Sequence, residues 1–222
     1  MKLPFAIQDF LDVFKRYNTT LFPVQVLLLL LALFILLLVL RHNRWANKAV
    51  FIILALLWVW MGAAYHISFF STINPAAWGF GLAFIAEGLL LLTYGLKKVP
   101  VVRYAKDVRG FVAILLVSYA LIIYPALGYL AGHVYPYAPT FGLPCPTTIF
   151  TFGIFLLTTS QLPITITLIP ILWSLIGFSA ALSLGMIEDI GLVIACLLFI
   201  FLSITKQHTH MPTHATVEGP YN

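Results

Sequence analysis

The sequence predicts an all-α membrane protein: a bundle of about seven transmembrane helices preceded by an N-terminal amphipathic helix at the membrane interface. Of its 222 residues, 62% are hydrophobic and only 9% are charged, and the mean hydropathy is +1.03. Soluble domains carry roughly 25% charged residues, so a chain this apolar must expose much of its surface to lipid. Long continuous apolar runs also follow one another along the chain. Because backbone in lipid must bond within its own segment, these runs are expected to be helices.

The N-terminal segment, residues 1–20, contains an amphipathic pattern over residues 4–17. Phe10, Val13 and Phe14 follow helical spacing, while most of the polar residues lie on the other side. Such a helix is expected either to lie in the membrane interface or to pack on the bundle. The pattern favours neither alternative.

The transmembrane domain is predicted to cover residues 21–205. Its spans are expected at residues 21–40, 49–70, 76–96, 110–131, 146–160, 163–184 and 189–205. The fifth span is short and bounded by Pro146 and Pro163, so a re-entrant segment is the alternative there.

Residues 206–222 are predicted to form a disordered tail. Its histidines, His208, His210 and His214, could bind copper or nickel weakly, although a tail without such a role is the simpler interpretation.

Lysine and arginine positions predict the orientation. Loops 41–48 and 97–109 and the C-terminal tail together carry nine of the twelve basic residues, whereas the other side carries Lys2, Lys15 and Arg16. The positive-inside rule therefore places the N-terminus outside and the C-terminus in the cytoplasm. The net charge of +5 is thus attributed to topology, and nucleic acid is not expected as a partner.

Several residues with metal-binding side chains are predicted to share the outer face. His66, His133, Cys145 and Asp189 are expected near the outer ends of their spans, and together they could bind zinc or copper. Alternatively, His66 and His133 could ligate one haem. No closely spaced pair of ligands supports either site, and each histidine could instead bond a loop carbonyl.

Cys145 stands between two prolines, and Pro146 is suited to the first residue of a helix. Cys145 is therefore predicted to be the N-cap of the fifth span, with Thr147 and Thr148 in its first turn. A thiol there faces the positive end of the helix dipole, which favours the reactive thiolate, and free N–H groups could hold an anion. The alternative is a tight turn without chemistry.

Glu87 is the only formally charged residue deep within a predicted span. An unpaired carboxylate is costly there, so Glu87 is expected to be neutral, paired, or in a water-filled cavity. Such residues often mark a proton or cation pathway. A protonated carboxyl bonded to a neighbouring helix is the alternative.

Three sequence motifs resemble a family of bacterial inner-membrane proteins that is classified only as a domain of unknown function. They are Tyr65-His66, Asn74-Pro-Ala-Ala-Trp78, and Pro139-Thr-Phe-Gly-Leu-Pro-Cys-Pro-Thr-Thr148. The resemblance covers most of the chain except the His-rich tail. It implies a polytopic membrane protein and no particular activity.

We therefore expect a site near the outer face that binds or moves a small solute or a metal ion. Interrupted, Pro-bounded helices such as the fifth span tend to line such sites. The residues expected to form it are His66, Asn74, His133, Cys145, Thr147, Thr148 and Asp189, with Glu87 extending it toward the membrane centre.

Two other functions remain open: a redox protein using haem or a reactive thiol, and a structural subunit of a homo-oligomer or larger membrane complex. No phosphate-binding loop or hydrolase motif occurs, so an enzyme is not favoured.

Overall fold

The apolar runs of the sequence form helices. The computed structural model describes residues 4–41 and 43–209, with side chains described through residue 205. In chain order the main helices are α1 (Ile7–Leu21), α2 (Val24–Val39), α3 (Arg44–Trp60), α4 (Ala77–Lys98), α5 (Val108–Ser118), α6 (Tyr124–Leu130), α7 (Pro144–Leu156), α8 (Leu168–Leu184) and α9 (Ile190–Thr209). The described residues contain no β-strand, only isolated bridges.

Two of these helices continue through π-helical turns. The segment η1 (Met61–Phe69), followed by the 3₁₀ turn η2 (Phe70–Thr72), extends α3, and η3 (Tyr119–Ile123) joins α5 to α6. Single 3₁₀ turns, η4 (Ile164–Ile166) and η5 (Ile187–Asp189), precede α8 and α9. π-Helical turns are rare and often occur at functional sites, and η1 contains His66.

Four helical stretches are long and apolar enough to cross a membrane: Arg44–Thr72, Ala77–Lys98, Val108–Leu130 and Ile187–Thr205. The pair α1 and α2 meets this criterion jointly but is bent by 87°, and α7 and α8 are apolar but shorter. The seven predicted spans therefore all correspond to helices, but only four or five of them meet the criterion for crossing. The thirteen residues of α7 span about 20 Å, less than a bilayer core of about 30 Å.

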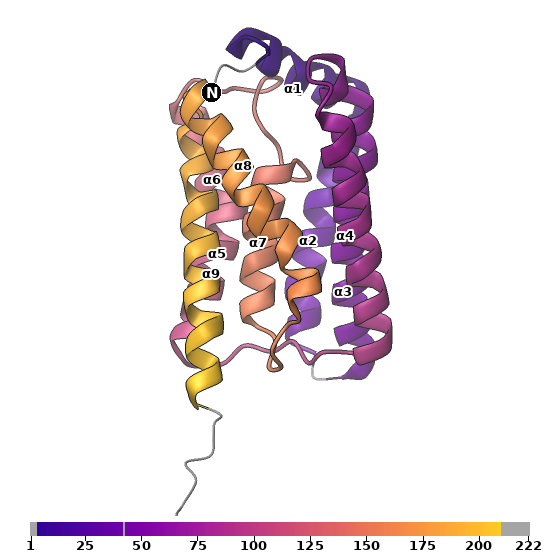
Figure 1. Cartoon of the computed structure of the whole chain (residues 1–222), viewed down its shortest axis with the longest axis vertical. Helices are drawn as coiled ribbons and strands as arrows, with labels where there is room; N and C mark the ends of the chain where they lie inside the picture. The colour runs from indigo at the N-terminus through magenta and orange to yellow at the C-terminus, as the bar shows by residue number, and fades with distance from the viewer. Residues whose placement is uncertain (1–3, 42, 210–222) are drawn as a thin grey trace, which may run out of the picture.

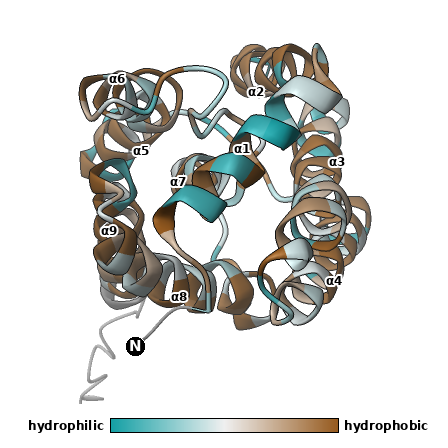
Figure 2. Ribbon diagram, turned by 90° about the horizontal axis from the view of Figure 1, so that it is seen from above, coloured by the Kyte–Doolittle hydropathy of each residue, from teal (hydrophilic) through white to brown (hydrophobic). Residues whose placement is uncertain are grey.

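Helix α1 lies across one end of the bundle, which we call the α1 end (Figures 1 and 2). Its buried residues are Val13, Phe14, Tyr17 and Asn18, so its apolar face packs on the bundle. The helix begins three residues after the predicted start and continues to Leu21, at the start of the predicted first span. Packing on the bundle was one of the two predicted alternatives, and the exposed side of α1 remains available to the interface.

Two sets of hydrogen bonds hold α1 in place. The Asn18 amide donates to the carbonyls of Pro136 and Ala138, each at 2.8 Å. The Trp60 indole N–H donates to the Tyr17 hydroxyl at 2.7 Å. Because Asn18 and Tyr17 are fully buried, these bonds tie α1 both to the loop after α6 and to α3.

Helix α7 occupies the centre of the bundle, surrounded by the longer helices (Figure 2). Every residue of α7 except Cys145 is buried. The chain reaches α7 from the α1 end, where loop 136–140 contacts Asn18. It leaves at the opposite end, where the Arg103 N–H donates to the Leu157 carbonyl at 3.0 Å. The segment therefore enters at one end of the bundle and leaves at the other.

The C-terminal end of α2, the start of α3 and loop 99–107 lie at the end opposite α1 (Figure 1). We call it the basic end, because Arg41, Arg44, Lys97, Lys98 and Arg103 occur in or beside these segments. The positive residues that predicted the orientation therefore do share one end of the structure.

Glycines bring α4 against α3 and η1. A Cβ on Gly62 would lie 2.6 Å from the Gly81 carbonyl oxygen, and a Cβ on Gly88 would lie 2.8 Å from the Ala55 oxygen. Small residues permit this close helix contact. The consequence is that η1 is held tightly beside α4, which places His66 inside the bundle.

Candidate functional site

A cavity of about 200 Å³ lies beneath α1, at the α1 end of the bundle. We call it the α1 cavity. Its walls come from α1, η1, η2, α4, the start of α7, and α8. The lining residues are Phe5, Phe10, Phe14, Tyr65, Phe70, Asn74, Phe80, Leu143, Pro144, Cys145, Trp173, Ile176, Gly177, Ser179, Ala180, Ala181, Leu184 and Asp189.

Three predicted site residues meet at this cavity, namely Asn74, Cys145 and Asp189. Asn74 precedes α4, and its side-chain oxygen accepts from the Ala76 N–H at 3.1 Å, which leaves its amide NH₂ as a donor. Asp189 is 5% exposed, and its Oδ1 accepts from the Tyr124 hydroxyl at 2.6 Å. The Cys145 thiol interacts with the Asp189 carboxyl. The structure therefore places these three residues on the lining of one cavity, and their role in binding stays a prediction.

The predicted role of Cys145 as the N-cap of its helix is wrong. The N-cap is Leu143, in an extended conformation, and Cys145 is the second residue of α7, after Pro144. Pro144 and Pro146 lack N–H groups, and the Thr147 N–H already bonds the Leu143 carbonyl at 3.3 Å. This helix start therefore offers an anion few free donors.

His133 belongs to a different cluster. Its Nδ1 lies 2.7 Å from Glu188 Oε1, and both side chains are largely or wholly buried. The Tyr119 hydroxyl donates to the Glu188 carbonyl oxygen at 2.8 Å. Together with the Tyr124–Asp189 bond, these contacts join the α5–α6 segment and the residues after it to η5. Here His133 and Glu188 bind each other, and neither lines the α1 cavity.

His66 lies in an aromatic environment beside the α1 cavity. It is fully buried, and its ring centroid lies 4.6 Å from that of Phe84, 5.0 Å from Trp173 and 5.2 Å from Tyr65. Neither ring nitrogen has a hydrogen-bond partner among the described residues. The predicted bond to a loop carbonyl is therefore absent there, and aromatic packing takes its place.

The remaining predicted residues are buried away from the cavity lining. Thr147 Oγ1 accepts from the Gly142 N–H at 3.1 Å, so it stabilises the turn before α7. Thr148 Oγ1 and both carboxyl oxygens of Glu87 have no partner within the described part of the chain. Glu87 shares the buried face of α4 with Phe84 and Leu91. Glu87 is not among the residues that line the α1 cavity. The predicted extension of the site toward Glu87 therefore stays a prediction.

The four predicted metal ligands are divided among three environments. Within residues 4–41 and 43–205, no three His, Cys, Asp or Glu side chains come together in a way that could hold a metal ion. Both cysteines are free thiols. The metal and haem sites therefore remain predictions without a structural group that supports them. The tail histidines lie beyond the residues whose side chains are described.

Comparison with known proteins decides the family. A family model described as "Family of unknown function (DUF6064)" matches residues 7–213. The chain belongs to this family. No curated protein and no solved structure was found to match it.

The predicted membership of an uncharacterised family is confirmed. Whether the three quoted motifs are characteristic of the family stays a prediction. In this DUF6064 protein the run 74–78 leads into α4, and the run 139–148 leads through a turn into α7. Both runs contribute to the walls of the α1 cavity, through Asn74 and Cys145 respectively.

The aromatic walls of this DUF6064 protein's cavity were not predicted from the sequence. Phe5, Phe10 and Phe14 reach it from the N-terminal segment, and Trp173 reaches it from α8. The amphipathic pattern of residues 4–17 could have indicated the contact of these three phenylalanines, because the apolar face of a helix packs against another apolar surface. Nothing in the local sequence singles out Trp173.

Proposed function

We propose that this protein is an integral membrane protein that binds a small organic amine in the α1 cavity, with the basic end of the bundle in the cytoplasm. Nine basic residues of loops 41–48 and 97–109 and the tail support the orientation, since positive residues remain preferentially on the cytoplasmic side. The amine-binding role depends on one observation: a carboxyl group is set into a small cavity with aromatic walls, and none of the described basic residues lines it.

The volume limits the size of the ligand. The cavity measures about 200 Å³, and a buried apolar cavity of about 150 Å³ accepts benzene. Ligands of drug size usually occupy pockets of about 300 Å³ or more. A molecule with one ring, or an aliphatic chain of similar volume, therefore fits the space beneath α1.

The chemistry of the walls favours a cation over an anion. Phe10, Phe14, Tyr65 and Trp173 present aromatic rings, which attract organic cations through their π-faces. Asp189 supplies a carboxyl group on the same cavity, and no Lys or Arg within residues 4–41 and 43–205 lines it. An amine would gain both a hydrogen bond and charge complementarity, whereas a carboxylate of the same shape would be repelled or left unpaired.

The experiment uses three probes of equal size and different charge: benzylamine, benzyl alcohol and benzoate. Thermal melting of the purified full-length protein in detergent measures binding, because a ligand that binds only the folded state raises the melting temperature. We expect benzylamine to stabilise most, benzyl alcohol less, and benzoate not at all. Equal stabilisation by all three, or by none, would contradict the proposal.

Two variants localise the effect. Asp189→Asn retains an oxygen that can accept from Tyr124, so the fold is retained while the preference for benzylamine over benzyl alcohol is expected to disappear. Ala181→Leu fills the cavity and should weaken both probes. Ser183→Leu adds a leucine to the exposed side of the same helix and is expected to leave binding unchanged. Binding that survives Ala181→Leu would place the probe elsewhere.

A further inference from the structure

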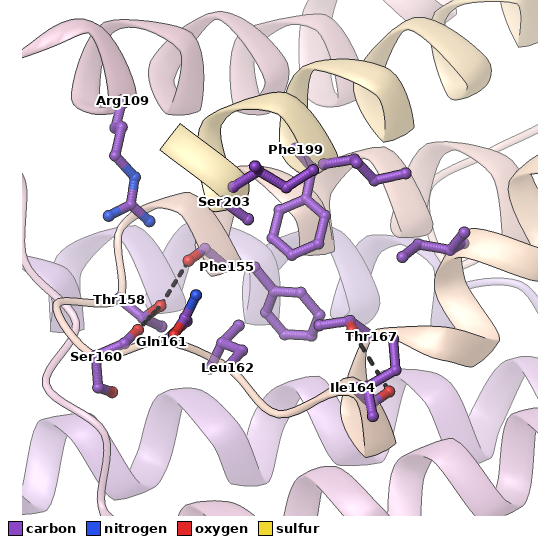
Figure 3. Close-up of a pocket in the computed structure, with 13 residues that line it drawn as sticks. Arg109, Phe155, Thr158, Ser160, Gln161, Leu162, Ile164, Thr167, Phe199 and Ser203 are labelled. Atoms are coloured by element: carbon purple, nitrogen blue, oxygen red, sulfur yellow. Dashed lines mark hydrogen bonds between the residues drawn. The ribbon is translucent and has the colours of Figure 1, made fainter. Parts of the chain in front are cut away.

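A second pocket lies at the basic end of the bundle. It adjoins the C-terminal end of α7, whereas the α1 cavity adjoins the N-terminal end of that helix. It measures about 320 Å³ and lies among the start of α5, the C-terminal end of α7, loop 158–167, and the adjoining ends of α8 and α9. We call it the α8–α9 pocket. Figure 3 shows its lining, with Arg109 on one side and phenylalanine rings on the other.

One pole of the pocket is polar and positive. Arg109 extends from the first turn of α5, and its guanidinium group points toward the pocket (Figure 3). Its Nε is buried and has no hydrogen-bond partner among the described residues. Ser160, Gln161 and Ser203 also line the pocket, and no Asp or Glu in the described part of the chain does. This pole is therefore complementary to an anion, because a buried guanidinium N–H without an acceptor is unfavourable.

The other pole is apolar and opens toward lipid. Phe155 and Phe199 form its inner wall. Ile164, near the start of α8, is 64% exposed, and Ile204, near the end of α9, is 50% exposed, and both line the pocket. With the bundle in a membrane, these exposed isoleucines would face lipid, so an occupant could enter from the side between α8 and α9.

We propose that the α8–α9 pocket binds an anionic phospholipid, with its phosphate at Arg109 and an acyl chain between α8 and α9. The planar guanidinium binds phosphate oxygens in pairs, and basic pockets between membrane helices on the cytoplasmic side suit anionic head groups. A free phosphate ion would leave the apolar walls uncovered. A zwitterionic lipid also carries a phosphate, but its ammonium group would place a further positive charge near Arg109, Arg103 and Lys106.

The location of the pocket supports the same occupant. Arg109 is the second residue of α5, where the helix leaves the loop of the basic end. Phospholipid head groups lie at this depth, at the boundary of the hydrocarbon core. Arg103 and Lys106, in the same loop, are exposed and add positive charge nearby. This site is independent of the amine site proposed for the α1 cavity, which lies at the other end.

The test compares lipids on the delipidated full-length protein in detergent. Melting curves are recorded with phosphatidylglycerol, with phosphatidylcholine of the same acyl chains, and with inorganic phosphate. We expect stabilisation by phosphatidylglycerol at concentrations where the other two have little effect. Equal stabilisation by phosphatidylcholine would overturn the proposal, and stabilisation by phosphate alone would indicate a soluble-anion site instead.

Matched variants locate the head group. Arg109→Gln is expected to weaken phosphatidylglycerol binding about fivefold, and Arg109→Lys, which keeps the charge, should weaken it less. Arg103→Gln removes an exposed charge from the same loop and should have a smaller effect than Arg109→Gln. If Arg109→Gln and Arg103→Gln weaken binding equally, the lipid responds to general surface charge and the proposed site is wrong.

A second pair of variants locates the acyl chain. Ser203→Phe places a ring in the pocket and is expected to reduce phosphatidylglycerol binding while leaving Arg109 in place. Thr205→Phe adds the same ring to an exposed position on α9 and should not reduce it. Because this comparison leaves the charge unchanged, it stays informative even if Arg109→Gln fails to fold. Unchanged binding in Ser203→Phe would overturn the proposed path of the chain.

Discussion

Replacing His133 with alanine should destabilise the α1 end of the bundle strongly. The His133 Nδ1 and Glu188 Oε1 atoms are 2.7 Å apart, and the two side chains are only 11% and 0% exposed. Water therefore cannot easily replace the missing imidazole. His133→Ala leaves the Glu188 carboxyl buried without its partner, and removing one member of a buried pair costs about 3–5 kcal/mol.

That free energy corresponds to a large shift in melting temperature. For a chain of this size, 1 kcal/mol moves the melting temperature by roughly 2–4 °C, so His133→Ala should lower it by about 6–20 °C. The measurement is thermal unfolding of purified protein in detergent without added ligand. Because His133 does not line the α1 cavity, this result tests the architecture of this end separately from amine binding.

A double-mutant cycle distinguishes the pair from the residues themselves. Glu188→Gln keeps an oxygen that can accept from His133 and removes the carboxylate, so it should destabilise less than His133→Ala. In the Glu188→Gln background, His133→Ala should cost at least about 1 kcal/mol less than in the native protein. A shift below about 2 °C for His133→Ala, or the same cost in both backgrounds, would refute this reasoning.

Four further substitutions, one of them a control, test other contacts in the same melting assay. Asn18→Ala should lower stability by about 1–3 kcal/mol because two partly buried carbonyls of loop 136–138 lose their donor. An unchanged melting temperature would show that α1 is held by other contacts. Gly95→Ala should destabilise by about 1–3 kcal/mol, since its Cβ would collide with a phenylalanine of α3. Gly79→Ala, in the same helix with nothing within 4 Å of a new Cβ, should stabilise by about 0.5–1 kcal/mol, and equal effects of the two would contradict the packing. Thr151→Val removes the acceptor 3.1 Å from the buried Trp58 indole nitrogen and should cost about 1–3 kcal/mol, whereas a neutral result would mean that this bond contributes little.

The helices of the bundle were predictable because each is a local property of the chain. The apolar run predicted at 76–96 appears as α4, and the run predicted at 110–131 appears as the continuous α5–α6 stretch, each within two residues at both ends. A segment in lipid has to satisfy its own backbone hydrogen bonds, so its state depends on little outside itself. The predicted fifth span at 146–160 was less accurate, since α7 begins at Pro144 and ends at Leu156.

The candidate site was only partly predictable, for a different reason. Asn74, Cys145 and Asp189 were each singled out by residue type and by predicted side of the membrane, and the structure places all three on the α1 cavity. The predicted side of the membrane did not distinguish these three residues from His133, which binds Glu188 instead. Two residues at the same depth can face different neighbours, and that choice depends on how the helices rotate and pack.

The sequence by itself determined the composition of a lipid-facing bundle, the positions of its helices, and the concentration of positive charge at one end. Hydrophobic length and the placement of Lys and Arg are sufficient for these features, because they act segment by segment. Only the tertiary structure decided that α1 folds over the bundle end, that the short α7 stands at its centre, and that one cavity lies beneath α1 and another between α8 and α9. Such features arise where helices far apart in the chain leave space between them, and no single segment specifies that space.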